Sequence, residues 1–303
     1  MKNIAVLIPC YNEAATVAEV VKSFRKSLPL ADIYVYDNCS EDNTVELARS
    51  AGATVVTAKI RGKGNVVRKM FADINADIYI MADGDLTYDA ADAIRMIETM
   101  LTEQADMVVA VRREKSEAAY PMGHKFGNRI FTFILELLFH STFRDIFSGY
   151  RAFSKRFIKT FPIMSNGFDI EVELSIHALT LAIPCAEIDS QYLERPLNSH
   201  SKLSAFKDGF QILFSVIKLL EETRPLFFFG LIALLLLVIS VVISCPIIAT
   251  FIETGLVPRL PTAVLATGLT LLSFLSLTCG IIMDSISNTR REIKKLHYLE
   301  FAI

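Results

Sequence analysis

The sequence predicts an α/β domain with a mostly parallel sheet, followed by an amphipathic segment and two membrane-spanning helices. Short apolar segments alternate with segments of helical spacing over residues 4–111, which is typical of a parallel sheet with helices on both faces. Polar clusters follow several of the apolar segments. Two long uncharged runs occupy residues 226–252 and 260–283. Mean hydropathy is +0.41, and the excess lies in these runs.

The expected strands are short apolar segments that end at proline, glycine or polar residues. They comprise residues 4–8, 33–36, 54–57, 78–82 and 107–111. The expected helices comprise residues 14–28, 44–51, 65–74 and 91–101. Ser40-Glu41-Asp42-Asn43 supplies helix-start chemistry before the second of them. Ligands of such sheets bind beyond the carboxyl ends of the strands.

Each of the two uncharged runs exceeds the roughly 20 apolar residues that a membrane-spanning helix needs. The link between them is short, so they form a hairpin with both ends on one side. Four basic residues follow the second run, whereas the link contains one, Arg259. The basic residues after the run are Arg290, Arg291, Lys294 and Lys295. The positive-inside rule therefore predicts that both ends are cytoplasmic.

Four segments follow from these patterns. They are a first domain at 1–203, an amphipathic juxtamembrane helix at 204–225, a transmembrane hairpin at 226–285 and a basic cytoplasmic tail at 286–303. Apolar residues of 206–220 share one helical face, which favours a helix lying in the membrane interface. A second amphipathic segment, 126–138, either lies in the interface or packs on the sheet.

Composition excludes several classes of protein. A net charge of −2 gives no support for nucleic-acid binding through bulk electrostatics. The five cysteines form no C-x-x-C pair, which argues against a zinc site or a disulfide framework. The apolar segment Ile4–Ile8 is too short for the core of a signal peptide, so we expect the first domain to stay in the cytosol.

The strongest chemical signal is Asp83-Gly84-Asp85, directly after an apolar strand. Two carboxylates separated by one residue at a strand end can face one hard cation, and Mg²⁺ and Mn²⁺ prefer oxygen ligands. Such a cation can neutralise a diphosphate leaving group. A simple turn is the alternative, because Asp-Gly is common in turns.

Further motifs accompany this pair in a fixed order. They are Pro9-Cys10-Tyr11-Asn12-Glu13 after the first strand, Asp37 followed by Ser40, Asp42 and Thr44, and then Asp83 to Asp85. Together they resemble the family-two inverting glycosyltransferases with a GT-A (Rossmann-like) fold. Asp37 is then expected to bind a nucleobase edge, with a local turn or helix-cap role as the alternative.

The resemblance narrows to the polyprenyl-phosphate glycosyltransferases, which include dolichol-phosphate-mannose synthases. Four segments carry it: Asp145–Arg151 (D-x-x-S-G-Y-R), Gly167–Glu171, Arg195 with Ser199, Ser201, Lys202 and Leu203, and Thr223–Leu226. Many dolichol-phosphate-mannose synthases have Gln two residues after the D-x-D motif, where this chain has Thr87. That difference weakens an expectation of mannose and leaves the third metal ligand open.

The resemblance implies a UDP- or GDP-sugar donor, an undecaprenyl- or dolichyl-phosphate acceptor in the membrane, and Mg²⁺ or Mn²⁺. The donor site would comprise Pro9, Tyr11, Glu13, Asp37, Lys63 and Asp83, and the metal site Asp83, Asp85 and Thr87. Lys63 lies in Gly62-Lys63-Gly64, which is only a weak phosphate-loop pattern and equally fits a surface loop. A homo-oligomer is also expected.

Basic residues near the membrane are candidates for holding the lipid phosphate. Arg195 and Lys202 lie shortly before the membrane helices, and arginine binds phosphate through paired hydrogen bonds. Arg112, at a strand end, and Arg151 are expected to assist. Ordinary attraction of juxtamembrane basic residues to anionic lipid is the alternative. A phosphate acceptor is already an anion, so positioning and electrostatics should dominate catalysis.

Three other functions fit the sequence less well. A sugar-phosphate nucleotidylyltransferase usually has a Gly-rich loop where this chain has Pro9–Glu13. A processive polysaccharide synthase usually has a Q-x-x-R-W motif, which a chain without tryptophan lacks. A non-catalytic membrane scaffold would not need the acidic and basic site residues, and their presence in this chain argues against that function.

Overall fold

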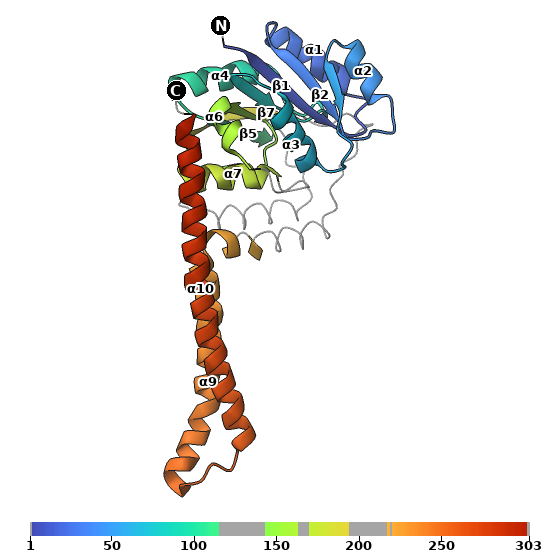
Figure 1. Ribbon diagram of the computed structural model, residues 1–303. Coiled ribbons are helices and arrows are strands. Elements are labelled where there is room, and N and C mark those ends of the chain that lie inside the picture. Colours follow the sequence, from blue (N-terminus) through green and yellow to red (C-terminus); the bar gives the residue numbers. More distant parts are fainter. Residues whose placement is uncertain (1, 115–142, 163–169, 194–216, 219, 302–303) are drawn as a thin grey trace. The chain divides into compact units, whose positions relative to one another are not determined.

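The computed structural model describes residues 2–114, 143–162, 170–193, 217–218 and 220–301 (Figure 1). The first of its two compact units comprises residues 1–209 and 294–303, and the second comprises residues 210–293. The expected amphipathic helix at 126–138 and most of the one at 204–225 lie outside the described residues.

One sheet organises the first unit, with strand order β3-β2-β1-β4-β6-β5-β7. The strands are β1 (Ile4–Cys10), β2 (Asp32–Asp37), β3 (Thr54–Thr57), β4 (Ile78–Met81), β5 (Met107–Glu114), β6 (Arg151–Ser154) and β7 (Cys185–Tyr192). All neighbouring pairs are parallel except those of β6, which runs antiparallel to β4 and β5. Met81 pairs with Arg151, so β6 begins where β4 ends. The residues before β6 therefore join the carboxyl end of the parallel strands.

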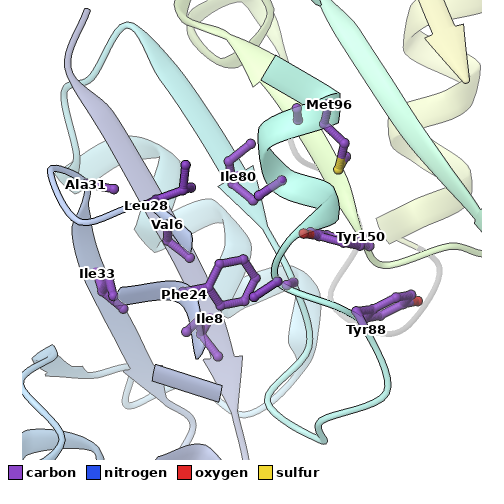
Figure 2. Packing of buried hydrophobic residues seen from close by; sticks show 14 of the residues in the cluster. Val6, Ile8, Phe24, Leu28, Ala31, Ile33, Ile80, Tyr88, Met96 and Tyr150 are labelled. Atoms are coloured by element: carbon purple, nitrogen blue, oxygen red, sulfur yellow. The ribbon is translucent and has the colours of Figure 1, made fainter. Parts of the chain in front are cut away.

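Helices cover both faces of this sheet. They are α1 (Val17–Ser27), α2 (Thr44–Ser50), α3 (Lys63–Asp73), α4 (Asp92–Thr102), α6 (Lys155–Thr160) and α7 (Ile170–Leu181). Successive side chains of a strand point to opposite faces, and both faces are apolar here. Buried side chains of α1, α2 and α4 share one cluster with alternate strand residues such as Val6 and Ile80. Figure 2 shows Phe24 of α1 within this cluster, where its ring packs edge-on to Tyr150 with centroids 6.2 Å apart.

The opposite face is covered by aromatic contacts from α3 and α6. Phe71 of α3 packs against Phe153 of β6 with ring centroids 5.8 Å apart. Phe153 in turn contacts Phe157 of α6 at 5.0 Å. Because both faces are buried, the central strands need apolar residues at consecutive positions, which is why β1 and β4 are continuous apolar runs.

The predicted α/β class is confirmed, and the five expected strands and four expected helices of residues 4–111 are all present. Two differences matter for the site. The antiparallel strand β6 was not expected, because its residues are too few to show a period. Lys63 and Gly64 lie in the first turn of α3 rather than in a loop, with Gly62 at a positive φ of 119° as the helix cap.

The second unit contains two long apolar helices, α9 (Pro225–Thr254) and α10 (Leu260–Glu300). Both are long and apolar enough to cross a membrane. Serine hydroxyls link them: Ser240 donates to the Ala266 carbonyl at 2.7 Å and Ser273 to the Ala233 carbonyl at 2.8 Å. Small residues and interhelical hydrogen bonds of this kind hold membrane helices together.

Helix α10 continues 17 residues beyond the expected span, through the expected basic tail to Glu300. Residues 284–300 contain no proline or glycine, so nothing interrupts the backbone hydrogen bonds. The last residues belong to the first unit. There Tyr298 is buried and donates a hydrogen bond to Asp106. The Arg156 guanidinium lies over the Tyr298 ring, 4.3 Å from the ring centroid.

Candidate functional site

Three polar loops meet at the carboxyl ends of β1, β2 and β4. The backbone amide of Asn38 donates to the Cys10 carbonyl at 2.8 Å, which joins the first two loops. The Thr16 hydroxyl donates to the Gly84 carbonyl at 2.6 Å, which joins the first and third. The sequence places these loops far apart, and parallel pairing of β1 with both neighbours brings them together.

The loop between β1 and α1 is shaped by side chains from the second loop. Backbone amides of Asn12, Glu13 and Ala14 donate to Ser40 Oγ, Thr44 Oγ1 and Asp42 Oδ2 at 2.8, 2.9 and 3.1 Å. The side chains of the S-x-D-x-T pattern thus hold the backbone at the end of the Pro9–Glu13 segment, and the pattern also leads into α2. Pro9, Tyr11 and Glu13 are all half-buried. The Arg61 guanidinium lies 5.4 Å from the Tyr11 ring centroid.

Asp37 ends β2 and is 2 % exposed. Its carboxylate oxygens accept hydrogen bonds from the Ser40 amide at 3.3 and 3.2 Å. The neighbouring Asn38 anchors the loop before α3, because its Oδ1 accepts from the Gly62 amide at 2.7 Å and its Nδ2 donates to the Ile60 carbonyl at 2.8 Å. Asp37 is therefore held at the junction of these loops.

Asp85 is the more buried carboxylate of the acidic pair, at 5 % exposure. Its Oδ1 accepts from the Thr87 amide at 3.2 Å and from the Thr87 hydroxyl at 2.5 Å. Leu86 between them has a φ of 62°, in the left-handed region that non-glycine residues seldom adopt. Thr87 itself is 1 % exposed, so in this structure its hydroxyl serves Asp85.

Asp83 has a different environment, because it and a second acid, Glu171, both contact the ammonium of Lys63. Lys63 Nζ lies 2.5 Å from Asp83 Oδ1 and 2.5 Å from Glu171 Oε1. Burial by itself lowers the pKa of Lys63, but the two carboxylates outweigh it and raise the pKa of this ammonium above its ordinary value. The lysine is therefore charged at neutral pH.

The second oxygen of Asp83 lies against Gly149. A methyl group at Gly149 would be 2.5 Å from Asp83 Oδ2, closer than any ordinary contact. Only glycine leaves room for the carboxylate in this position. The Gly149 amide donates to Tyr88 Oη at 3.1 Å, which fixes the backbone on the other side. Burial raises the pKa of Tyr88, so its phenol stays neutral.

Arg112 lies near this cluster and is oriented by Asp145. Its Nε and Nη2 donate to the two oxygens of Asp145 at 2.7 and 2.8 Å, a bidentate pair. The guanidinium also lies 5.6 Å from the ring centroid of Tyr192, and Tyr192 packs against Tyr88. Arg112 is thus held in place by a carboxylate and an aromatic ring.

Arg151 is fully buried, with its guanidinium bound to the loop that precedes it. Its Nε donates to the Ser148 carbonyl at 2.8 Å, and its Nη2 donates to the Ile146 carbonyl. Nη1 donates to the Ser175 hydroxyl of α7 at 2.9 Å. This residue was expected to assist with a phosphate. In the structure its contacts hold the loop that contains Gly149.

The acidic pair offers two of the oxygen ligands that a divalent cation uses, and substrate oxygens would have to complete its coordination. Within the described ranges, no group of three or more His, Cys, Asp or Glu side chains is placed to hold a metal. Mg²⁺ is commonly bound through one or two carboxylates together with substrate phosphates and water. Asp83 already has a cationic partner in Lys63.

The other expected residues divide into two groups. Arg195 and Lys202 lie outside the described residues. Glu171, Gly149 and Asp145 were noticed in the sequence only as parts of motifs, and the structure gives each a contact in the site. Their positions in these motifs could have identified them as site residues. Their contact partners could not be predicted in the same way, because the partners come from other segments of the chain.

Comparisons with known proteins agree with this architecture. The sequence model described as Glycosyl transferase family 2 matches residues 5–161. The glycosyltransferase AglJ of Haloferax volcanii is 36 % identical over 75 % of this chain and 75 % of its own length. A dolichyl-phosphate hexose transferase of the same organism is 26 % identical, covering 73 % of this chain and 96 % of that protein. An undecaprenyl-phosphate mannosyltransferase of Micrococcus luteus is 24 % identical over 65 % of this chain and 86 % of its own.

A solved structure supports the fold. Glucosyl-3-phosphoglycerate synthase of Mycobacterium tuberculosis, in complex with Mn²⁺, UDP and glucosyl-3-phosphoglycerate, superposes with a TM-score of 0.58. The match covers 73 % of this chain and 79 % of that one at 23 % identity. The expected GT-A-type fold is therefore confirmed.

Proposed function

The chain belongs to glycosyl transferase family 2 and is a glycosyltransferase, and we propose that it transfers a sugar from a nucleotide-sugar to a polyprenyl phosphate with inversion of the anomeric carbon. One observation carries the proposal. The acidic pair Asp83 and Asp85 lies at the carboxyl end of β4, in a chain that also has two helices able to span a membrane. The two relatives named for dolichyl phosphate and undecaprenyl phosphate support a lipid acceptor.

The donor side of the site uses the three joined loops. We assign the nucleobase to the region of Asp37 and the Pro9–Glu13 segment, because these residues end β1 and β2. Asp83 and Asp85 would hold Mg²⁺ or Mn²⁺ on the donor diphosphate, with Thr87 orienting Asp85 through its hydroxyl. The cation would neutralise the charge that develops on the departing nucleotide diphosphate.

The acceptor side requires positive charge rather than a general base, because a phosphate is already an anion near neutral pH. Arg195 and Lys202 would bind the lipid phosphate. Arg112, oriented by Asp145, adds positive charge nearby. We propose that Arg151 acts by positioning, since its guanidinium holds the carbonyls of the loop containing Gly149.

The two long apolar helices indicate membrane association. We propose an integral membrane protein with segments 1–203 and 286–303 on the cytoplasmic side, where basic residues accumulate after the second span. Cysteine labelling at Ser40, Thr254 and Ile303 in spheroplasts tests this arrangement. Labelling of Ile303 from outside would contradict it.

The decisive experiment for the reaction is transfer from a panel of UDP- and GDP-sugars to polyprenyl phosphate, with the anomeric configuration of the product determined by NMR. Two variants then separate the substrates. Asp37→Ala should weaken nucleotide binding and leave the KM for lipid unchanged. Arg195→Ala should raise the KM for lipid about tenfold to hundredfold, the usual effect of losing a charge-assisted phosphate contact. Loss of nucleotide binding in Arg195→Ala with an unchanged lipid KM would refute the assignment.

A further inference from the structure

The most unusual feature of the site is a single ammonium shared by two acids from different elements. Lys63 Nζ is 2.5 Å from oxygens of both Asp83 and Glu171. The side chains of Lys63 and Glu171 are 12 % and 6 % exposed, whereas that of Asp83 is 28 % exposed. Of the two acids, Asp83 is therefore the one that faces the open side of the site.

The backbone around Lys63 is held in place. Lys63 begins α3, and the amide of the preceding Gly62 donates to Asn38 Oδ1 at 2.7 Å. Glu171 lies in the first turn of α7, where a carboxylate is favoured by the helix dipole. The lysine stem is flexible, so the ammonium can move while its backbone and Glu171 remain in place.

A divalent cation on Asp83 would compete with Lys63 in its present position. Lys63 occupies Asp83 Oδ1, and Oδ2 lies against Gly149. Two cations a few ångströms apart also repel each other strongly in a partly buried site. A metal that binds Asp83 would therefore favour displacement of the ammonium, and the displaced ammonium would need a new anionic partner.

We infer that Lys63 is a built-in counter-ion that occupies Asp83 while the donor site is empty and moves to the donor diphosphate when the metal arrives. This inference rests on the proposed function. The pair with Glu171 gives Lys63 a permanent anchor, because Glu171 is too buried to remain unpaired at low cost. Lys63 can turn from Asp83 to a phosphate while keeping Glu171.

Cooperative binding follows from this exchange. Metal alone must compete with Lys63, and nucleotide alone must bind without its metal. Each ligand therefore improves the binding of the other by the same factor. A coupling factor of roughly 5 to 150 is typical of such linked equilibria.

The test is Mn²⁺ binding to the full-length protein in detergent, measured by electron paramagnetic resonance with and without UDP, and in parallel with GDP. In the wild type, nucleotide should raise the Mn²⁺ affinity at least about tenfold. Lys63→Met should bind Mn²⁺ about tenfold more tightly than wild type without nucleotide, and it should lose most of the coupling. Lys69→Met is the matched control, since Lys69 lies on the same helix and is 41 % exposed.

A second variant guards against misfolding caused by an unpaired Glu171. Lys63→Met combined with Glu171→Gln removes both charges, and it should show the same tighter Mn²⁺ binding and reduced coupling. Equal Mn²⁺ affinities of wild type and this double variant without nucleotide would overturn the inference and leave the proposed reaction intact. No Mn²⁺ binding by any of the proteins, with either nucleotide, would overturn the metal role and the inference together.

Discussion

Replacing Gly149 by alanine should separate catalysis from stability. The added methyl would lie 2.5 Å from Asp83 Oδ2, whereas ordinary contacts begin near 3.4 Å, so the carboxylate must move by about 0.9 Å. A displacement on the order of 1 Å in a reacting site can cost about a hundredfold in rate. We therefore expect turnover to fall about tenfold to hundredfold.

The fold should tolerate this change. The methyl meets the end of a side chain rather than the backbone, and Gly149 does not have the positive φ that would strain an alanine. The assay compares sugar transfer, Mn²⁺ binding with UDP, and the thermal midpoint in detergent. Gly230→Ala is the control, because nothing lies within 4 Å of its added methyl.

Two outcomes would refute this reasoning. Wild-type turnover and Mn²⁺ affinity in Gly149→Ala would show that the position of the Asp83 carboxylate is unimportant. A large fall in the thermal midpoint would show that the methyl displaces the backbone rather than the carboxylate.

Three further predictions concern the metal site and the buried polar groups. Asp85→Asn should reduce turnover at least about a hundredfold, and excess chelator should abolish activity until Mg²⁺ or Mn²⁺ is added; full activity in chelator would contradict the metal role. Burial lowers the pKa of His177 from 6.5 to about 3, so the neutral form stabilises the fold above pH 6.5 and this contribution declines as the pH falls towards 3. At pH 5.5 the stability lost relative to pH 7.5 is roughly 1 kcal/mol, so the thermal midpoint of His177→Phe should fall less than that of the wild type between pH 7.5 and 5.5; an equal decrease would assign the pH dependence to other groups. Tyr298→Phe removes the hydrogen bond to buried Asp106 and should cost about 1 kcal/mol of stability; an unchanged thermal midpoint would show that this contact contributes nothing.

Local patterns were sufficient for most of the secondary structure. Residues 4–8 and 78–82 are apolar runs too short for helices, and they form β1 and β4 with small shifts at the ends. Val17, Val20, Val21 and Phe24 have helical spacing and are all buried in α1. These predictions succeeded because burial on one or both faces imposes a period that is visible in a single segment.

The elements after residue 114 were harder to predict. Strand β6 has four residues and begins with the charged Arg151, so it shows no strand period. It forms because the neighbouring strands β4 and β5 supply hydrogen-bond partners on both sides, and because carbonyls and Ser175 satisfy the buried guanidinium. Only contacts between distant segments provide these conditions.

The amino-acid sequence by itself determined the α/β class, the two apolar helices, the family resemblance and the acidic pair at the end of β4, since each depends on neighbouring residues or on motif order. The tertiary structure decided which charges meet. Lys63 and Asp83 are 20 residues apart, and Glu171 is a further 88 along the chain, yet one ammonium contacts both acids. Gly149 reaches Asp83 only because β6 runs antiparallel to β4. The period of apolar side chains along a segment indicates which face of a helix or strand is buried. Which residues from distant segments contact each other in the site depends on strand order and direction, and no local pattern contains that information.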